Sequence, residues 1–198
     1  VAFVGPSGGG KTTLANVISR FFDPKSGSVS IGGVDVKDIS KEELMNTVSF
    51  VFQNSRLIKA SILDNVRMGK PEATREEVMR ALEMAQCSDI IEKLPDGIDT
   101  VIGTGGIYLS GGEQQRIAIA RVMLKNTPVI IMDEATAFAD PDNEVRVQEA
   151  FSNLARGKTV IMIAHRLSTI TNVDKIFVVK DGQIAEEGTS EQLLEQGG

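Results

Sequence analysis

Apolar residues along the chain alternate between short continuous runs and segments with helical spacing. Mainly apolar runs at residues 1–4, 48–52, 128–132 and 159–164 predict strands, and the continuous run at 128–132 is typical of a parallel sheet that is buried on both faces. Two further runs around a tight turn predict a hairpin over residues 175–185. Alternating strands and helices indicate an α/β fold with a mainly parallel sheet.

Polar residues that favour helix N-termini mark most of the predicted helix starts. Ser40 and Thr74 are each followed three residues later by a glutamate, which is the capping-box pattern. Asp140 pairs with proline at the first helical position and opens a helix to about Ala155. A tight turn at Gly32-Gly33 predicts a small hairpin over 28–36. The remaining predicted helices run from 11 to about Phe22, from Ser61, from 74 to about 86, from 112 to 124, and after Thr189 with Gln192 completing its cap.

The alternation of predicted strands and helices stops between Ser55 and Tyr108, where no convincing strand pattern occurs. This block contains the helices that begin at Ser61 and Thr74 and a turn at Pro95-Asp96-Gly97. We interpret it as a helical subdomain that is inserted into a strand-helix core. The predicted segments are 1–54 for the first part of the core, 55–110 for the helical subdomain and 111–198 for the second part of the core.

Composition and charge exclude several classes of protein. The 198 residues are 41% hydrophobic and 24% charged, which is ordinary for one globular domain. A net charge of −6 without a basic stripe argues against nucleic acid as a partner. One cysteine, Cys87, excludes an internal disulfide, and no apolar run approaches the roughly 20 residues of a membrane span. Because Val1 begins inside a strand without an initiator methionine, we expect the chain to be a piece of a longer protein.

A glycine-rich segment at residues 5–12, GPSGGGKT, carries the strongest chemical signal. A strand precedes it and a helix follows it, the context of a phosphate-binding loop whose backbone N–H groups point at phosphate oxygens. In such a loop Lys11 reaches the β- and γ-phosphates and Thr12 places its hydroxyl on Mg²⁺. The alternative is a glycine-rich turn that precedes a lysine by chance, and both flanks argue against it. The predicted nucleotide-binding residues are Gly5, Pro6, Ser7, Gly8, Gly9, Gly10, Lys11, Thr12 and Thr13.

Two carboxylates, Asp133 and Glu134, close the buried strand at 128–132. Ligands of open α/β sheets bind at the carboxyl ends of parallel strands. Asp133 is therefore placed to hold Mg²⁺ beside Thr12, and Glu134 to polarise a water for attack on the γ-phosphorus. The alternative is a pair of acidic residues that simply leave a strand.

The segment at residues 109–116, LSGGEQQR, distinguishes this chain from other phosphate-loop proteins. Its serine and two glycines at a helix start leave N–H donors for an anion. Taken alone it is a helix cap, but together with GPSGGGKT before it and IIMDEAT after it, it resembles the signature motif of the ATP-binding cassette (ABC) family. The resemblance extends over the whole chain and implies a RecA-like P-loop NTPase core. The signature residues are Leu109, Ser110, Gly111, Gly112 and Glu113.

The resemblance implies roles for three more residues. Gln53 matches the lid glutamine that contacts Mg²⁺ and water and senses the membrane domain. His165 matches the switch histidine near the γ-phosphate, although a lone histidine is otherwise more often structural. Asp140 matches the aspartate of the loop that crosses the dimer interface. The family's catalytic positions are thus Glu134, His165, Gln53 and Lys11, and its metal positions are Thr12, Gln53 and Asp133.

The resemblance also implies partners. In this family two nucleotide-binding domains pair head to tail, and ATP lies between the phosphate loop of one and the signature of the other. Ile163-Ala164-His165-Arg166 and the segment at 94–100 are similar to exporter-type cassettes, which are usually fused to a six-helix membrane domain and work at the cytoplasmic face. ATP hydrolysis would then drive substrate movement across the membrane.

Three departures from the family pattern stand out. The aromatic residue that stacks on adenine in this family lies upstream of the phosphate loop, outside this chain. Ala137-Phe138-Ala139-Asp140 replaces the usual Ser-Ala-Leu-Asp and resembles siderophore-linked transporters. The loop at 102–106 lacks the acidic residue that exporters often carry there. Since the adenine platform is missing, we expect weak nucleotide binding and weak turnover from this fragment alone.

Two other functions remain as alternatives. One is a soluble cassette ATPase that acts on DNA or ribosomes, but such proteins carry long coiled-coil insertions or tandem cassettes. The other is a regulatory cassette that binds ATP without hydrolysing it. Regulatory cassettes usually lack the base, the switch histidine or a signature glycine, whereas this chain has all of them.

Overall fold

A computed structural model of the protein describes residues 1–52, 56–103, 107–133, 141–164 and 173–195. The chain packs into two compact units, each of which is described by itself. The first unit contains Val1–Phe50, Val129–Ala135 and Thr159–Gly198. The second contains Val51–Pro128 and Thr136–Lys158.

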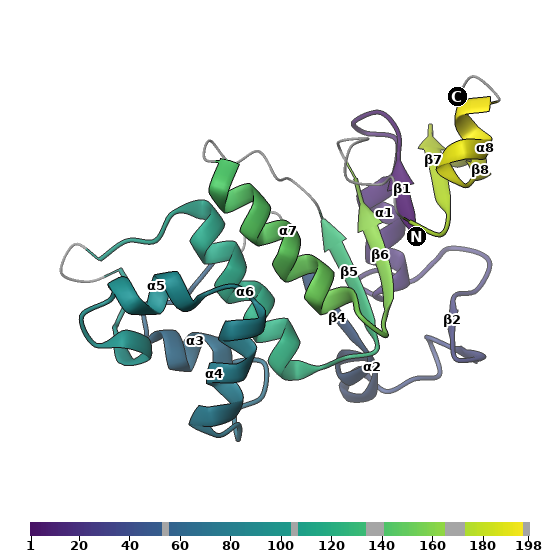
Figure 1. Ribbon diagram of the computed structural model, residues 1–198. Coiled ribbons are helices and arrows are strands. Elements are labelled where there is room, and N and C mark those ends of the chain that lie inside the picture. Colours follow the sequence, from purple (N-terminus) through teal and green to yellow (C-terminus); the bar gives the residue numbers. More distant parts are fainter. Residues whose placement is uncertain (53–55, 104–106, 134–140, 165–172, 196–198) are drawn as a thin grey trace. The chain divides into compact units, whose positions relative to one another are not determined.

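A six-stranded sheet organises the first unit, with the strand order β4-β5-β6-β1-β7-β8 (Figure 1). The pairs β5–β6, β6–β1 and β1–β7 are parallel, and the hairpin pair β7–β8 is antiparallel. Phe3, Ile131, Ile163 and Val179 form part of its buried core. The predicted parallel sheet is confirmed, and its strands are β1 Ala2–Val4, β4 Val48–Val51, β5 Val129–Asp133, β6 Thr159–Ile163, β7 Ile176–Lys180 and β8 Gln183–Gly188.

The first helix ends earlier than its apolar spacing predicts. α1 runs over Lys11–Ile18, and Ser19 rather than Phe22 lies at its end. Arg20 adopts a left-handed conformation with φ of 55°, and its guanidinium donates to the carbonyl oxygens of Val36 and Ile39. The bonds of Arg20 to a neighbouring segment therefore stop the helix, which helical spacing alone does not reveal.

The remaining elements of the first unit agree with the sequence pattern apart from one cap. Ser40 accepts from the N–H of Glu43, and within the described part of the chain only this half of the predicted capping box forms. At the last helix Thr189 and Gln192 bond to each other's backbone N–H groups as predicted. These elements are the small hairpin β2 Ser30–Ile31 and β3 Val34–Asp35, and the helices α2 Lys41–Thr47 and α8 Ser190–Glu195.

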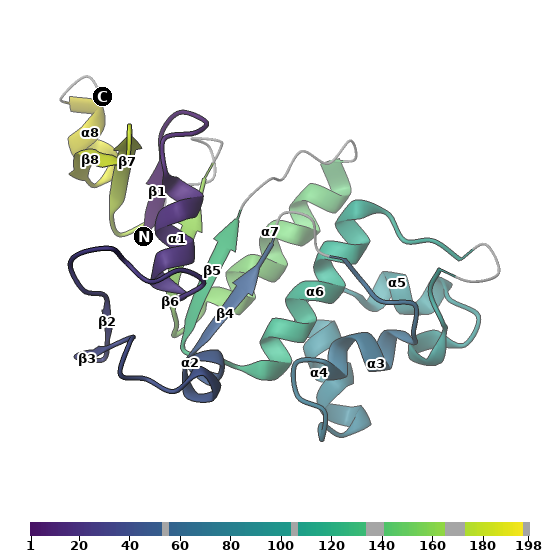
Figure 2. The same cartoon turned by 180° about the vertical axis from the view of Figure 1, so that it is seen from behind.

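Helices form the second unit, with α6 packed against α3, α4 and α7 (Figure 2). These four helices bury Ile62, Leu82, Ile117 and Leu154, one residue from each helix. The sequence pattern missed α5, because this six-residue helix has no side-chain cap at Cys87. The helices are α3 Ile62–Arg67, α4 Arg75–Met84, α5 Ser88–Lys93, α6 Gly111–Lys125, α7 Pro141–Ala155 and the 3₁₀ turn η1 Gly97–Asp99.

α6 and α7 belong to the same compact unit as the helices between Val51 and Pro128. Both helices contact each other and α4 within the second unit. The predicted division into 1–54, 55–110 and 111–198 stays a prediction. Within the described ranges, no helix is long and apolar enough to cross a lipid bilayer.

Candidate nucleotide site

A loop of four glycines, one proline and one serine connects β1 to α1 in the first unit. Gly5, Gly8 and Gly10 have φ angles of 133°, 79° and 108°, a region that side chains disfavour. The N–H of Gly9 donates to the Pro6 carbonyl oxygen at 3.1 Å and closes a turn inside the loop. Gly10 is the N-cap of α1 without a side-chain cap bond, so the first-turn N–H groups of α1 suit an anion.

The back of this loop lies on the backbone of β7. A Cβ atom on Gly5 would lie 2.1 Å from the Val179 carbonyl oxygen, and a Cβ on Gly9 would lie 2.7 Å from the same atom. The N–H of Gly182, in the β7–β8 turn, donates to the Gly9 carbonyl oxygen at 2.9 Å. The β7–β8 hairpin therefore shapes the loop from behind, a contact for which the sequence carried no signal.

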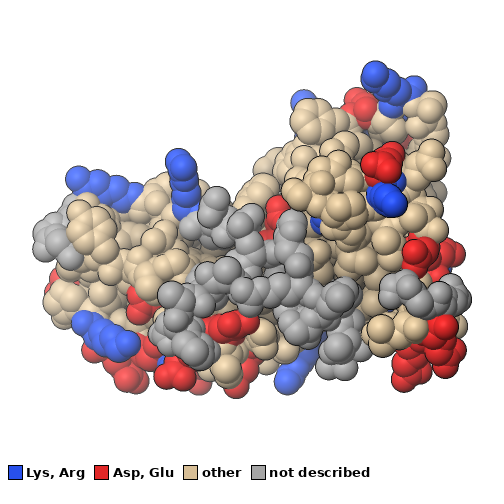
Figure 3. All heavy atoms as spheres, turned by 90° about the horizontal axis from the view of Figure 1, so that it is seen from above, with Lys and Arg blue, Asp and Glu red and all other residues tan. Residues whose placement is uncertain are grey.

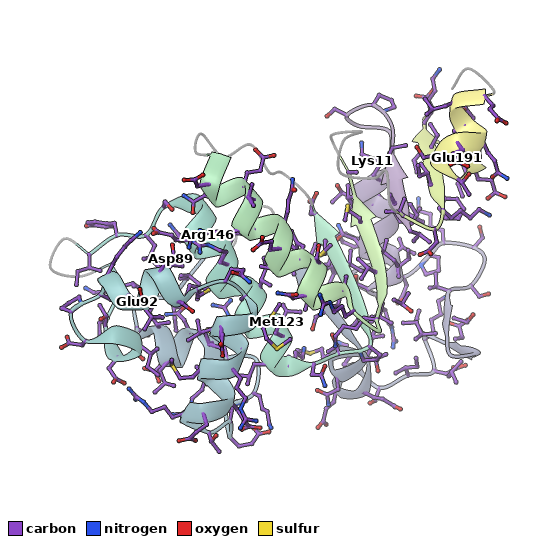
Figure 4. The ribbon with its side chains drawn as sticks, in the orientation of Figure 1. Lys11, Asp89, Glu92, Met123, Arg146 and Glu191 are labelled. Atoms are coloured by element: carbon purple, nitrogen blue, oxygen red, sulfur yellow. The ribbon has the colours of Figure 1, made fainter. Side chains whose placement is uncertain are left out.

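Lys11 directs its ammonium group into the loop (Figure 4). Its Nζ donates to the carbonyl oxygens of Gly5 at 2.8 Å and Pro6 at 2.9 Å, and the residue is 4% exposed. An ammonium group has three donors, so these two bonds leave one for a phosphate oxygen. Lys11 thus both braces the loop and presents a positive charge where phosphates would bind.

Strand register brings Asp133 to the same edge of the sheet as the loop. Asp133 pairs with Ile163 on β6, and Ile163 pairs with Phe3 on β1, two residues before Gly5. The three strands are parallel, so their carboxyl ends share one edge, where ligands of α/β sheets bind. That Asp133 and the loop serve one site stays a prediction, for which this register provides the necessary proximity.

The side chains at this edge fit Mg²⁺ together with a nucleotide. Thr12 and Thr13 are exposed on the first turn of α1, and a hydroxyl with a carboxylate is a ligand set that Mg²⁺ accepts. Among the described residues no group of three His, Cys, Asp or Glu side chains could hold a metal by itself. Mg²⁺ usually completes its shell with water and substrate phosphates, so Thr12 and Asp133 would hold it only beside a bound nucleotide.

The signature residues lie at the start of α6 in the second unit. Ser110 is the N-cap, its Oγ accepts from the Glu113 N–H at 3.3 Å, and the Glu113 carboxylate accepts from the Ser110 N–H at 2.7 Å. Gln114 donates to the Leu109 carbonyl oxygen at 2.9 Å. Because Ser110 Oγ accepts in this box, its own hydroxyl proton can be donated to an anion. The exposed start of α6 therefore has donors that suit an anion, and the predicted role of the signature in nucleotide binding stays a prediction.

An ion-pair cluster lies behind this helix start. The Arg116 guanidinium, which is fully buried, donates to Asp89 at 2.7 Å, and Arg146 approaches the same carboxylate at 3.0 Å (Figure 4). Desolvation raises the pKa of Asp89, but the hydrogen bond and charge of Arg116, together with Arg146 and Lys93, outweigh it and hold the pKa below its ordinary value. Asp89 gave no sequence signal.

An apolar groove of about 200 Å³ lies beside the signature within the second unit. Ile58 and Tyr108, which are 49% and 78% exposed, contribute to its lining or rim with Ile102 and Leu109. Asn65 is fully buried and bonds to both the N–H and the carbonyl oxygen of Ile58, which holds this side of the groove in place.

Gln53, Glu134, Asp140 and His165 lie outside the described residues, as do 104–106 and 137–139. Their predicted roles stay predictions. On the face shown in Figure 3, the described Lys and Arg side chains are scattered among Asp and Glu and form no basic stripe.

Comparison with known proteins gives one family over most of the chain. Residues 1–137 match the model of the family described as ABC transporter. An ATP-dependent lipid A-core flippase of Desulfotalea psychrophila is 48% identical over the whole chain, and one of Chromobacterium violaceum is 47% identical. The mycobactin import ATP-binding/permease protein IrtA of Mycobacterium tuberculosis is 48% identical over 197 residues. The chain spans 35%, 34% and 23% of the lengths of these three relatives.

Proposed function

The chain belongs to the ABC transporter family, and we propose that it is the ATP-binding and ATP-hydrolysing motor of a membrane transporter. ATP-driven pairing of two such domains would be coupled to movement of a substrate across the membrane. The observation that supports this proposal is that a single chain presents two groups of donors that would each suit a phosphate. One is the loop braced by Lys11, and the other is the start of α6 capped by Ser110.

Each surface presents donors for an anion, and two copies arranged head to tail would supply both surfaces to one ATP. The loop N–H groups and Lys11 of one copy would bind the phosphates. Ser110 and the first-turn N–H groups of α6 of the second copy would approach from the opposite side. Donors aimed at the transferred phosphoryl group stabilise its charge as the reaction proceeds, which is the largest protein contribution to phosphoryl transfer.

The remaining predicted residues divide the other tasks. Thr12, Asp133 and Gln53 would hold Mg²⁺, which neutralises phosphate charge. Glu134 would accept a proton from the attacking water, and His165 would contact the γ-phosphate. Asp140 would cross the interface between the two copies.

The membrane partner is a transmembrane domain, which we propose is fused to this chain in the full-length protein. Support comes from the word permease in the name of the mycobactin relative and from the short share of each relative that the chain spans. The groove with exposed Ile58 and Tyr108 suits a short apolar helix from that domain. The motor would then work at the cytoplasmic face of the membrane.

The transported substrate is chosen elsewhere in the full-length protein. A lipid A-core flippase and a mycobactin importer are equally identical to this chain at 48%. Similar ATPase domains would therefore drive the transport of different substrates, and the contacts to the substrate would lie in the membrane domain.

Replacing the proposed base tests the hydrolysis step. Glu134→Gln in the full-length protein should retain ATP binding and lose about 10²–10⁴-fold in turnover, because general bases contribute that much. Lys11→Ala is the matched control, since it should lose binding together with turnover. Unchanged turnover of Glu134→Gln would remove Glu134 as the base. A wild-type protein that binds ATP without hydrolysing it would favour the regulatory cassette instead.

A further inference from the structure

Asn143, in the first turn of α7, lies against the start of the signature helix. Its Oδ1 accepts from an Arg116 Nη at 3.1 Å. Its Cβ would lie 3.1 Å from a Cβ placed on Gly112, which is tighter than ordinary side-chain contact. One side chain thus contacts the backbone of a signature glycine and the side chain of the signature arginine.

The close approach gives Gly112 a structural reason to be glycine. Its neighbours on that side are the Cβ, Cγ and Oδ1 atoms of Asn143, at 3.1, 3.3 and 3.5 Å from an added Cβ. A side chain at 112 would require Asn143 to move by a few tenths of an ångström. The spacing between these two helix starts is therefore set by direct contact and has little freedom.

Arg116 extends this contact into a network that joins four segments. Its guanidinium donates to Asp89 at the start of α5, to the Gln86 carbonyl oxygen in the α4–α5 connection, and to Asn143 on α7. Arg116 is fully buried, and Gln86 has a left-handed φ of 59° that accompanies this connection. Arg146, one turn after Asn143 on α7, reaches the same Asp89 carboxylate. The start of α7 is thus bonded to the signature helix directly and again through Asp89.

We propose that Asn143 is a positioning residue: it couples the start of α7 to the Ser110–Gly112 segment so that both move as one piece when two copies close on ATP. This inference rests on the proposed function, because it assumes that Ser110–Gly112 contacts a nucleotide bound by a second copy. α7 begins directly after Asp140, the predicted interface residue. A shift at the interface end of α7 would therefore be transmitted to the signature donors through Asn143.

Small displacements of these donors have large effects on rate. A misplacement of about 1 Å at a reacting group can cost about 100-fold, even when the altered residue is remote from the chemistry. Removing the Asn143 acceptor leaves the buried Arg116 one bond short and weakens the link between α7 and the signature helix, which then depends on the Arg146–Asp89 pair. Nucleotide binding to the phosphate loop of the same copy involves none of these atoms and should not change.

The experiment compares three variants of the full-length protein. Asn143→Ala removes the acceptor and keeps the Cβ, and alanine favours the helix at least as well as asparagine. Asn143→Asp keeps both the Cβ and an acceptor for Arg116. Asp99→Asn is the control, because the Arg75–Asp99 pair is a half-exposed ion pair of the same unit without contact to the signature. ATP affinity, kcat, KM and Tm are measured for each.

For Asn143→Ala we expect at least a tenfold loss of kcat with unchanged ATP affinity, and for Asn143→Asp and Asp99→Asn a kcat within about twofold of wild type. A purely structural role of Asn143 would lower Tm and leave kcat unchanged below it, which would overturn the inference. Equal loss in Asn143→Asp would also overturn it. If the wild-type protein itself fails to hydrolyse ATP, the proposed function fails first, and the inference falls with it.

Discussion

Gly5 and Val179 approach so closely that a methyl group on Gly5 would lie 2.1 Å from the Val179 carbonyl oxygen. The first residue of the phosphate loop is therefore in direct backbone contact with β7, near the other end of the chain. This contact fixes the rear wall of the loop. The glycines of the loop are therefore of two kinds. At some positions a neighbouring backbone leaves no room for a Cβ atom, and at others only the positive φ angle disfavours a side chain.

Gly5→Ala and Gly8→Ala should consequently differ in severity. Gly8 has a φ of 79° with no atom within 4 Å of an added Cβ, so its replacement should cost about 1–2 kcal/mol from backbone strain alone. Gly5→Ala adds a collision with β7 and should abolish ATP binding and lower stability well beyond that amount. Chemical denaturation and fluorescent-nucleotide binding measure both effects. Equal stability of the two variants would contradict the predicted role of β7.

Ser110→Ala and Thr74→Ala should separate capping from nucleotide contact. Both residues form complete capping boxes, at α6 and α4 respectively, so each replacement should lower the free energy of unfolding by about 1 kcal/mol. Only Ser110→Ala should also lower kcat, because in the proposed function Ser110 would offer its hydroxyl proton to the nucleotide of a second copy. A similar loss of kcat in Thr74→Ala would assign the effect to helix stability.

The Asp89 cluster predicts an acid-sensitive contribution to stability. Since the folded pKa of Asp89 is below its value of 3.8 in the unfolded chain, the contribution is complete above about pH 4–5 and disappears as the pH falls through the folded pKa. Asp89→Asn should lose about 3–5 kcal/mol at neutral pH, because it leaves buried Arg116 unpaired. The difference from wild type should shrink at about pH 3 in urea titrations. A pH-independent difference would mean that packing, rather than charge, explains the loss.

We expect the buried amide group of Gln115 to lower the free energy of unfolding relative to an apolar side chain of the same length. It is 2% exposed, and within the described part of the chain neither its Oε1 nor its Nε2 has a hydrogen-bond partner. Gln115→Met keeps the length of the side chain and should raise the free energy of unfolding by about 1–3 kcal/mol. Gln114→Met is the matched control and should be destabilising, because Gln114 donates to the Leu109 carbonyl oxygen. Destabilisation by Gln115→Met would show that its amide gains a partner in solution.

Cys87 should report on the opening of the second unit. Burial raises the pKa of its thiol to about 12, so almost no thiolate forms at pH 8 in the folded protein. Alkylation by iodoacetamide should be very slow until urea unfolds the chain, and then match that of a free thiol. Fast labelling of the native protein would contradict the buried position of Cys87.

Local sequence patterns alone determined much of the fold and named most of the candidate site. Apolar runs located the strands β1, β4, β5 and β6, because a strand of a covered sheet has little polar alternation. Cap residues located the starts of α3, α4 and α8, because each cap satisfies backbone groups within its own first turn. Motifs named the loop, Lys11 and Ser110, because phosphate binding needs a fixed local order of glycines, a cation and hydroxyls.

Only the tertiary structure decided which distant residues support these motifs. Arg20 ends α1 through carbonyl groups of residues 36 and 39, and β7 shapes the phosphate loop from behind. Asn143 and Asp89 meet Arg116 although they lie on other helices. None of these contacts leaves a periodic or spaced pattern, because the partners are joined by packing across the chain rather than by neighbouring positions in it. Local motifs in the sequence thus identify the chemical groups of the site, while contacts between distant segments determine its geometry.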